Sequence, residues 1–114
     1  MIDEQDLPLE EQFNNELDKA DTMLDLMGGE RGSISVLQHL LANPELEAFP
    51  AIKAEAHAFL ARIHLGLNEP ELANLQLLQM QALDQSLLGD EARYEHLEEI
   101  THIQEQISAM CNEQ

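Results

Sequence analysis

Two apolar patterns of helical period, separated by a turn, fill the stretch from residue 54 to residue 85 and constrain the fold more than any other feature. Asn68 and Pro70 mark the turn. Ahead of it, apolar residues recur at spacings of about three and four, so they line one side of a helix. These residues are Ala54, Ala56, Phe59, Leu60, Ile63 and Leu67. The stretch therefore predicts a hairpin of two helices.

The helix expected after the turn, from Pro70 to Leu83, carries apolar residues on nearly every side. They are Leu72, Ala73, Leu75, Leu77, Leu78, Met80, Ala82 and Leu83. A helix that is apolar nearly all round is typical of one that other helices cover. We therefore expect this helix to lie sandwiched between its neighbours.

Two more helices are expected before this hairpin. The first begins near Asp6, with Pro8 in its first turn, where the missing N–H of proline has no cost, and it ends at the glycine pair 28–29. Its apolar stripe is Leu9, Phe13, Leu17, Ala20, Leu24 and Met27. Ser33 is expected to cap the second helix, which ends before Pro44. The expected buried side of this helix is Ile34, Leu37, Leu40 and Leu41.

Residues 44–49 are expected to form a connector between the two helical hairpins. Within it, Leu46 and Phe49 are the side chains that should reach the core. Pro50 then opens the third helix, since proline is well suited to the first helical position.

The last two helices have expected caps of their own. Asn68 is expected to cap the fourth helix, and Asp90 is expected to cap a fifth helix of residues 91–110. The apolar stripe of the fifth helix is Tyr94, Leu97, Ile100, Ile103, Ile107 and Met110. Five helices with short connections favour antiparallel neighbours in an all-α fold.

The composition agrees with an all-α domain, because strand-forming residues are scarce and Trp is absent. A chain of 114 residues has the usual size of one domain. The expected division is a disordered N-terminus (1–6), a single helical domain (7–110) with hairpins 7–43 and 50–84 and a last helix 91–110, and a loose C-terminus (111–114).

Charge is distributed unevenly along the chain, which has 23 acidic and 5 basic residues and a formal charge of −18. Residues 1–30 and residues 69–114 each carry ten acids and one base, whereas residues 31–68 carry three of each. Such a field repels nucleic acid and anionic membranes and attracts basic partners. It is equally consistent with acidic side chains that serve only to solubilise the protein.

The segments that would direct the chain to a membrane are not found in the sequence. The N-terminus is acidic, and no stretch approaches the roughly 20 apolar residues of a membrane span. Cys111 is the sole cysteine, so an internal disulfide is excluded and a reducing compartment is expected. We therefore expect a cytoplasmic protein, with homodimer formation left open.

The hairpin 54–85 carries Leu60 followed by the small Ala61, then the small Ala73, and an acid, Asp84, near its end. With these residues the chain resembles the tetratricopeptide repeat family, whose helix pairs stack into a curved solenoid that binds other proteins in its hollow. The resemblance implies that the last helix is a terminal capping helix.

The match to this family is incomplete. The first hairpin matches it only through Ala20, Leu24, Gly28 and Ser33. The second hairpin departs from the family at positions that are usually aromatic, Ala or Pro, namely His57, His64, Leu77, Met80 and Gln85. A generic five-helix bundle therefore stays as the alternative fold.

The resemblance also implies a binding groove lined by one side of the first, third and fifth helices. The groove positions that it implies are Asn15, Asp18, Thr22, Asp25, Glu55, Ala58, Arg62, Leu65, Glu95, Glu99 and His102. This groove is acidic, and it lacks the lysine and asparagine clamp with which some members hold a carboxylate. The implied ligand is a basic and apolar segment of a partner protein, and the implied role is that of an adaptor or a chaperone.

No phosphate-binding loop, nucleophile elbow or paired-cysteine site is present in the sequence, so we expect neither an enzyme nor a cofactor. Glu95, Glu98, Glu99 and His102 share one helix face, and Glu99 with His102 forms a Glu-x-x-His pair. Di-iron bundles use this pair twice, and here it occurs once. A metal site is therefore a minor hypothesis, and a solvated acidic face is favoured.

A second functional hypothesis follows from the charge alone. Carboxylates spaced along helices imitate the phosphates of a duplex, so the protein could act as a decoy that inhibits a basic nucleic-acid-binding protein. A decoy binds with a steep dependence on salt, whereas a groove with apolar contacts retains its partner at high salt. The nearly neutral centre of the chain, residues 31–68, favours the groove.

Overall fold

The computed structural model describes residues 8–26 and 28–112, and this part of the chain is helical without a β-strand. The expected disorder of residues 1–6 falls outside the described residues, as do Met27 and residues 113–114. The α-helices are α1 (Leu9–Leu24), α2 (Glu30–Leu41), α3 (Pro50–Gly66), α4 (Pro70–Ala82) and α5 (Asp90–Asn112), with short 3-10 helices η2 (Pro44–Ala48) and η3 (Gln85–Leu87). The predicted all-α class with five helices is confirmed.

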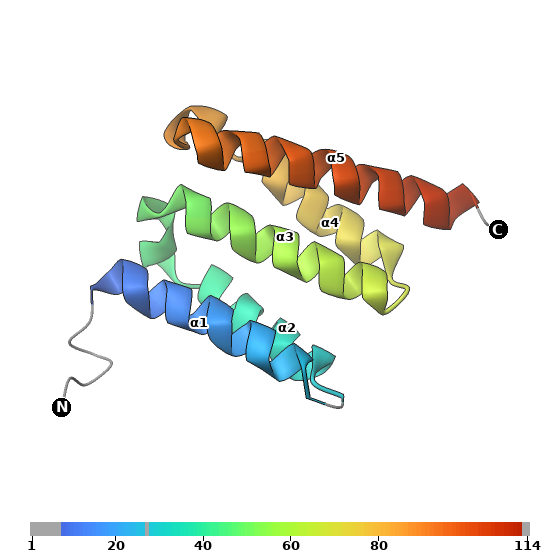
Figure 1. Ribbon diagram of the computed structural model, residues 1–114, viewed down its shortest axis with the longest axis horizontal. Helices are drawn as coiled ribbons and strands as arrows, with labels where there is room; N and C mark the ends of the chain where they lie inside the picture. Colours follow the sequence, from blue (N-terminus) through green and yellow to red (C-terminus); the bar gives the residue numbers. More distant parts are fainter. Residues whose placement is uncertain (1–7, 27, 113–114) are drawn as a thin grey trace.

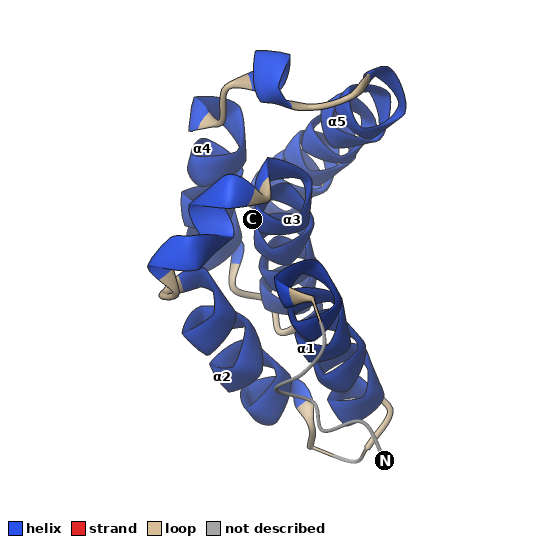
Figure 2. Cartoon of the chain, turned by 90° about the vertical axis from the view of Figure 1, so that its left-hand side faces the viewer, coloured by secondary structure: helices blue, strands red, loops and turns tan. Residues whose placement is uncertain are grey.

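The helices form two layers. Helices α1, α3 and α5 run side by side in the same direction, and α2 and α4 run back behind them (Figure 1). The side view separates the two layers clearly (Figure 2). Helix α1 packs mainly on α2 and only slightly on α3, whereas α5 packs on both α4 and α3. Helix α3 is therefore the central element.

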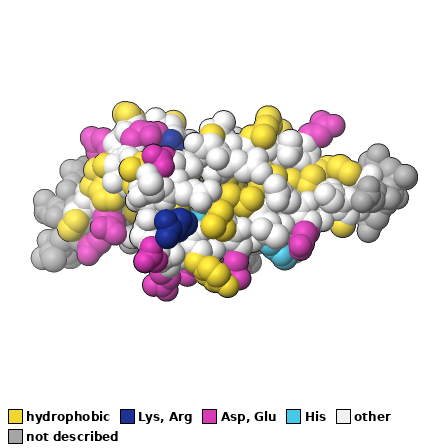
Figure 3. Space-filling view, turned by 90° about the horizontal axis from the view of Figure 1, so that it is seen from above, with side chains coloured by type: hydrophobic (Ala, Val, Ile, Leu, Met, Phe, Trp, Pro, Cys, Tyr) yellow, Lys and Arg dark blue, Asp and Glu magenta, His cyan; other side chains and the backbone are white. Residues whose placement is uncertain are grey.

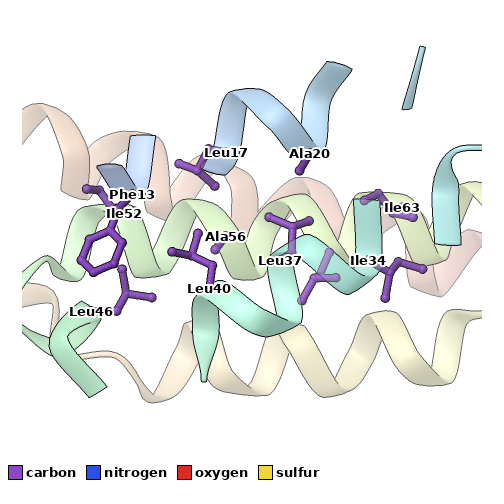
Figure 4. Packing of buried hydrophobic residues seen from close by; sticks show 11 residues of the cluster. Phe13, Leu17, Ala20, Ile34, Leu37, Leu40, Leu46, Ile52, Ala56 and Ile63 are labelled. Carbon is purple, nitrogen blue, oxygen red and sulfur yellow. The ribbon is translucent and has the colours of Figure 1, made fainter. Parts of the chain in front are cut away.

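The first hydrophobic core lies between α1, α2, η2 and one side of α3. Its side chains point toward one another from all these elements (Figure 4). The members are Phe13, Leu17, Ala20, Ile34, Leu37, Leu40, Leu46, Ile52, Ala56, Leu60 and Ile63. At its edge, the rings of Phe13 and Phe49 meet edge to face with centroids 5.6 Å apart. The predicted inward positions of Leu46 and Phe49 are confirmed.

The second core lies between the other side of α3 and helices α4 and α5. It consists of Ala58, Ala61, Ala73, Leu77, Met80, Ile100 and Ile103. The alanines let the three helices approach closely, because their side chains occupy little space between the backbones. Helix α3 thus serves both cores: Ile52, Ala56, Leu60 and Ile63 lie in the first, and Ala58 and Ala61 lie in the second.

Ser33 does not cap α2, contrary to the prediction, because the helix already begins at Glu30. Gly28 adopts a left-handed conformation with φ +73, and Gly29 is the residue before the helix. A Cβ atom at Gly29 would lie 1.6 Å from the carbonyl oxygen of Met23, so only glycine fits there. Because the glycine pair makes the turn, α2 begins before Ser33, and Ser33 lies buried inside the helix.

Two other predicted helix starts are shifted. Helix α1 begins at Leu9, not near Asp6, and Pro8 precedes it. Asn68 has φ 61 and follows the end of α3, and Glu69 is the residue before α4. Asn tolerates the left-handed conformation better than most residues, so it reverses the chain between the helices instead of capping the second one.

Helix α4 is not sandwiched, contrary to the prediction. Leu77 is buried, but Leu75 is 55% exposed, and Leu72 and Leu78 on the same side are also exposed. A two-layer arrangement of five helices leaves the outer side of α4 without a neighbour, although its sequence is apolar there (Figure 2).

The buried face of α5 is rotated relative to the predicted stripe. Tyr94 is 64% exposed and Leu97 is exposed as well, whereas His96 is buried in line with Ile100 and Ile103. The helix runs to Asn112, two residues beyond its expected end, and it includes the exposed thiol of Cys111.

Candidate binding groove between α3 and α5

A cavity of about 930 Å³ lies between α3 and α5, where its lining runs from Ala92 to Glu105. Residues of α3 reach it from positions separated by three or four, which form one side of that helix: Ala51, Glu55, Ala58 and Arg62. Helix α5 contributes carboxylates together with the exposed Tyr94 and Leu97. Seen from above, hydrophobic patches and carboxylates both lie on this face of the molecule (Figure 3).

Six of the eleven groove positions predicted from the sequence line this cavity. They are Glu55, Ala58, Arg62, Glu95, Glu99 and His102. Leu65 does not line it, because its side chain packs at the edge of the second core. The predicted positions that the structure brings together in this cavity therefore all come from α3 and α5, and Leu65 of α3 is not among them.

The four positions predicted for the first helix are exposed and do not line this cavity; three lie on α1 and one directly follows it. They are Asn15, Asp18, Thr22 and Asp25. The hydroxyl of Thr22 donates to the carbonyl oxygen of Asp18 at 2.9 Å, a bond within the helix.

The guanidinium of Arg62 contacts two neighbouring side chains. Its Nη1 donates to Glu99 Oε1 at 3.0 Å, and its guanidinium lies 5.7 Å from the centroid of the Phe59 ring. Arg62 is the one Lys or Arg among the described residues that line the cavity, which also contains five glutamates, Glu55, Glu95, Glu98, Glu99 and Glu105. The cavity is therefore strongly acidic.

His96 belongs to this site, although the sequence reasoning assigned it no role. The residue is 5% exposed and lines the cavity, and Nε2 donates to the carbonyl oxygen of Met80 at 3.0 Å. The successive spacings from His96 through Ile100 and Ile103 to Ile107 are four, three and four. A helical stripe that includes His96 would therefore have predicted that this residue is buried.

Two further histidines join α3 to the start and middle of α4. His57 Nδ1 donates to Gln76 Oε1 at 2.8 Å, and burial lowers the pKa of His57 from its ordinary value of 6.5. His64 Nδ1 lies 3.0 Å from Glu69 Oε1, and Arg31 of α2 lies 3.7 Å from the same carboxylate. These contacts tie α2, α3 and α4 together around Glu69.

A smaller cleft of about 490 Å³ lies between α2 and α4 on the opposite layer. Its apolar lining comes from Ile34, Leu72 and Leu75. Within residues 8–26 and 28–112, no three His, Cys, Asp or Glu side chains are grouped so that they could hold a metal ion. None of the helices in the same residues is long and apolar enough to cross a membrane.

Comparison with known proteins gives no relative for this chain. No protein-family model, curated protein or solved structure matches it significantly.

Proposed function

We propose that this protein is a small, tetratricopeptide-like interaction module that binds a basic and apolar segment of a partner protein in the groove between α3 and α5. The observation that carries the proposal is the cavity itself, in which five glutamates face one arginine that is already paired. An acidic surface of this kind attracts and orients cationic segments. The proposed role is that of a cytoplasmic adaptor or chaperone without catalytic activity.

The apolar side chains at the groove support a protein ligand over a purely ionic one. Tyr94 and Leu97 are exposed at the cavity, and Ala51 and Ala58 of α3 also line it. Aromatic and aliphatic contacts retain affinity when salt screens the charges. A partner segment with both basic and apolar residues fits this mixture.

The decoy is the second candidate, and the exposed carboxylates of α1 favour it. Glu10, Glu11 and Asp18 lie outside the cavity and face solvent. A decoy would use these side chains as much as those of the groove, because a duplex imitation works through its whole charged surface.

A pair of charge reversals distinguishes the two functions. Glu55→Lys with Glu95→Lys changes two exposed side chains of the groove, and Glu10→Lys with Glu11→Lys makes the same change in charge on α1. Each variant and the unchanged protein are used to capture proteins from a native lysate, with elution in rising salt.

The groove predicts one partner that persists at high salt, is lost by the groove variant and is kept by the α1 variant. Loss of nucleic-acid-binding proteins from both variants at the first modest salt step would favour the decoy. Equal capture by all three proteins would refute the groove. Leu65 is unsuitable for such a test, since its substitution would disturb the second core.

A further inference from the structure

The exposed side of residues 71–79, called the α4 face below, is an apolar surface that no other helix of the described residues covers. Its three leucines stand three residues apart, at Leu72, Leu75 and Leu78, and each is at least 40% exposed. Ala73 and Leu77, which lie between them in the sequence, are buried in the second core. Helix α4 lies at the margin of the layer that it forms with α2 (Figure 2). The leucines are therefore accessible to a second molecule.

The α4 face is also nearly uncharged, in a chain whose formal charge is −18. Glu71 is the single charged residue of α4, whereas α1 has five acidic residues and α5 has six. The centres of protein interfaces are depleted of charged residues. A basic partner would bind where the carboxylates are, but a second copy of the chain must avoid them, because two acidic chains repel each other. The α4 face is where two copies approach each other with little repulsion.

The order of side chains along the α4 face is symmetric about Leu75. The pairs at equal distance from Leu75 are Asn74 with Gln76, Leu72 with Leu78, and Glu71 with Gln79. Two copies of α4 that pack antiparallel about a two-fold axis at Leu75 place each member of a pair level with the other member on the second copy. Leucine then meets leucine, and the carboxylate of Glu71 meets the amide of Gln79, which can donate to it, instead of a second carboxylate.

The cleft between α2 and α4 gives this pairing a place for a leucine. Its apolar lining is Ile34, Leu72 and Leu75, and Leu78 does not contribute to it. In the antiparallel pair, Leu78 of the second copy lies level with Leu72 and therefore beside the cleft. Each copy thus offers a hollow and the side chain that packs into the hollow of the other, as a two-fold interface requires.

We propose that the α4 face binds a second copy of this chain through an antiparallel, two-fold pair of α4 helices centred on Leu75. The inference goes beyond the proposed function and does not depend on it, since none of the three leucines lines the α3/α5 cavity. A contact between two short helices is small, so the dimer is transient, with a Kd on the order of 10–100 μM. At about 1 μM the chain is then monomeric, and Leu75 behaves in urea unfolding as an exposed residue.

Sedimentation equilibrium of the full chain from about 5 to about 500 μM measures the association. The unchanged chain should pass from monomer to dimer over this range. The dimer should be tighter at about 0.5 M salt than at about 0.05 M, because salt screens the repulsion between two acidic chains.

Leu75→Glu should raise the Kd of the dimer roughly tenfold or more, because it places two carboxylates at the axis. Leu26→Glu makes the same change at an exposed leucine between α1 and α2, and it should alter the Kd less than about threefold. Circular dichroism of each variant confirms that it is folded.

Cross-linking by cysteine tests the antiparallel register. In a Cys111→Ser background, which removes the exposed native thiol, Leu75→Cys should form a disulfide with its own copy, because both lie at the axis. Leu72→Cys and Leu78→Cys should cross-link with each other when the two variants are mixed. Each should react far more slowly alone, since it lies about 9 Å along the helix from its own copy.

A monomeric mass at every concentration, or a dimer that Leu75→Glu leaves intact, would overturn the inference. Equal cross-linking of all three cysteine variants with their own copies would refute the antiparallel pairing. A monomeric chain that loses a lysate protein on Leu75→Glu would assign the α4 face to a different protein and equally overturn the dimer. Glu55→Lys with Glu95→Lys should keep the dimer, so failure of the groove and failure of the α4 face are measured separately.

Discussion

The two halves of the protein are held together by different kinds of contact. The first core, between α1, α2 and α3, consists mainly of leucine and isoleucine side chains with Phe13 and two alanines. The second core, between α3, α4 and α5, contains three alanines and is bordered by side-chain hydrogen bonds and ion pairs. Both cores share α3, so the difference lies in the helices that pack on it.

The position of the buried histidines shows what this difference means. His57, His64 and His96 are all contributed by α3 or α5, and each has a contact to α4 or to the turn before it. Polar groups in a core add little net stability and cost free energy when they are unpaired. The first half therefore supplies stability, and the second half carries the cavity.

Leu37→Ala should have the largest effect on stability, because Leu37 is fully buried in the first core. Truncation of a buried leucine costs about 2–5 kcal/mol of unfolding free energy. Urea unfolding measures this loss, and Leu75→Ala on the exposed side of α4 is the control, with an expected change within about 0.5 kcal/mol. Similar losses in the two variants would show that burial in the first core does not distinguish Leu37 from the exposed Leu75.

His57 should make the second half sensitive to mild acid. Burial lowers its pKa in the folded protein below the value of 6.5, with a smaller opposing contribution from the bond to Gln76. The unfolded chain therefore binds the proton more readily, so stability is complete above pH 6.5 and falls as the pH drops below it.

Urea unfolding at about pH 7.5 and about pH 5.5 measures this dependence on protonation. His57→Gln should lose less stability between the two conditions than the unchanged protein does. His39→Gln, at an exposed histidine of α2, should keep the full difference. An unchanged difference in His57→Gln would show that other groups cause the loss.

Periodicity was sufficient to predict the fold class and most of the first core. Phe13, Leu17, Leu37 and Leu40 stand at spacings that only a helix places on one side, and all four are buried. Proline positions were equally informative, since Pro50 and Pro70 do open α3 and α4. These signals are local, so the sequence alone contains them.

The exposed side of α4 could not be predicted, because it depends on which helices are present to cover it. Leu72 and Leu77 have the same local character, yet only Leu77 faces neighbours. On α5, two apolar stripes compete, and the one through His96 is buried although the one through Tyr94 is more apolar in sequence. Tertiary packing decides between them, with a histidine satisfied at the carbonyl oxygen of Met80.

The candidate site was predicted in part for the same reason. Glu55, Arg62 and Glu95 lie at helix positions that face one cavity, as the resemblance to helical repeats implied. The positions on α1, such as Asp18, do not reach it, because α1 packs on α2 and only slightly on α3. The path of α1 relative to α5 is a property of the packed structure and leaves no pattern in the sequence.

Ser33 is an exception in the first half, and its substitution should have the smallest effect. Ser33 is fully buried within α2, and its hydroxyl has no hydrogen-bond partner. Ser33→Ala should therefore stabilise the protein by about 1 kcal/mol, because it removes an unpaired polar group and introduces the best helix-forming residue.

A helix cap at Ser33 would give the opposite sign, a loss of about 1 kcal/mol on the same substitution. Urea unfolding therefore distinguishes the buried position from the cap that the sequence pattern favoured. Ser35→Ala, at an exposed position of α2, is the control for helix propensity alone, with a gain of only about 0.5 kcal/mol. A larger gain in unfolding free energy at Ser33 than at Ser35 would show that the buried Ser33 hydroxyl destabilises the first half. A loss at Ser33 would mean that this hydroxyl has a hydrogen-bond partner.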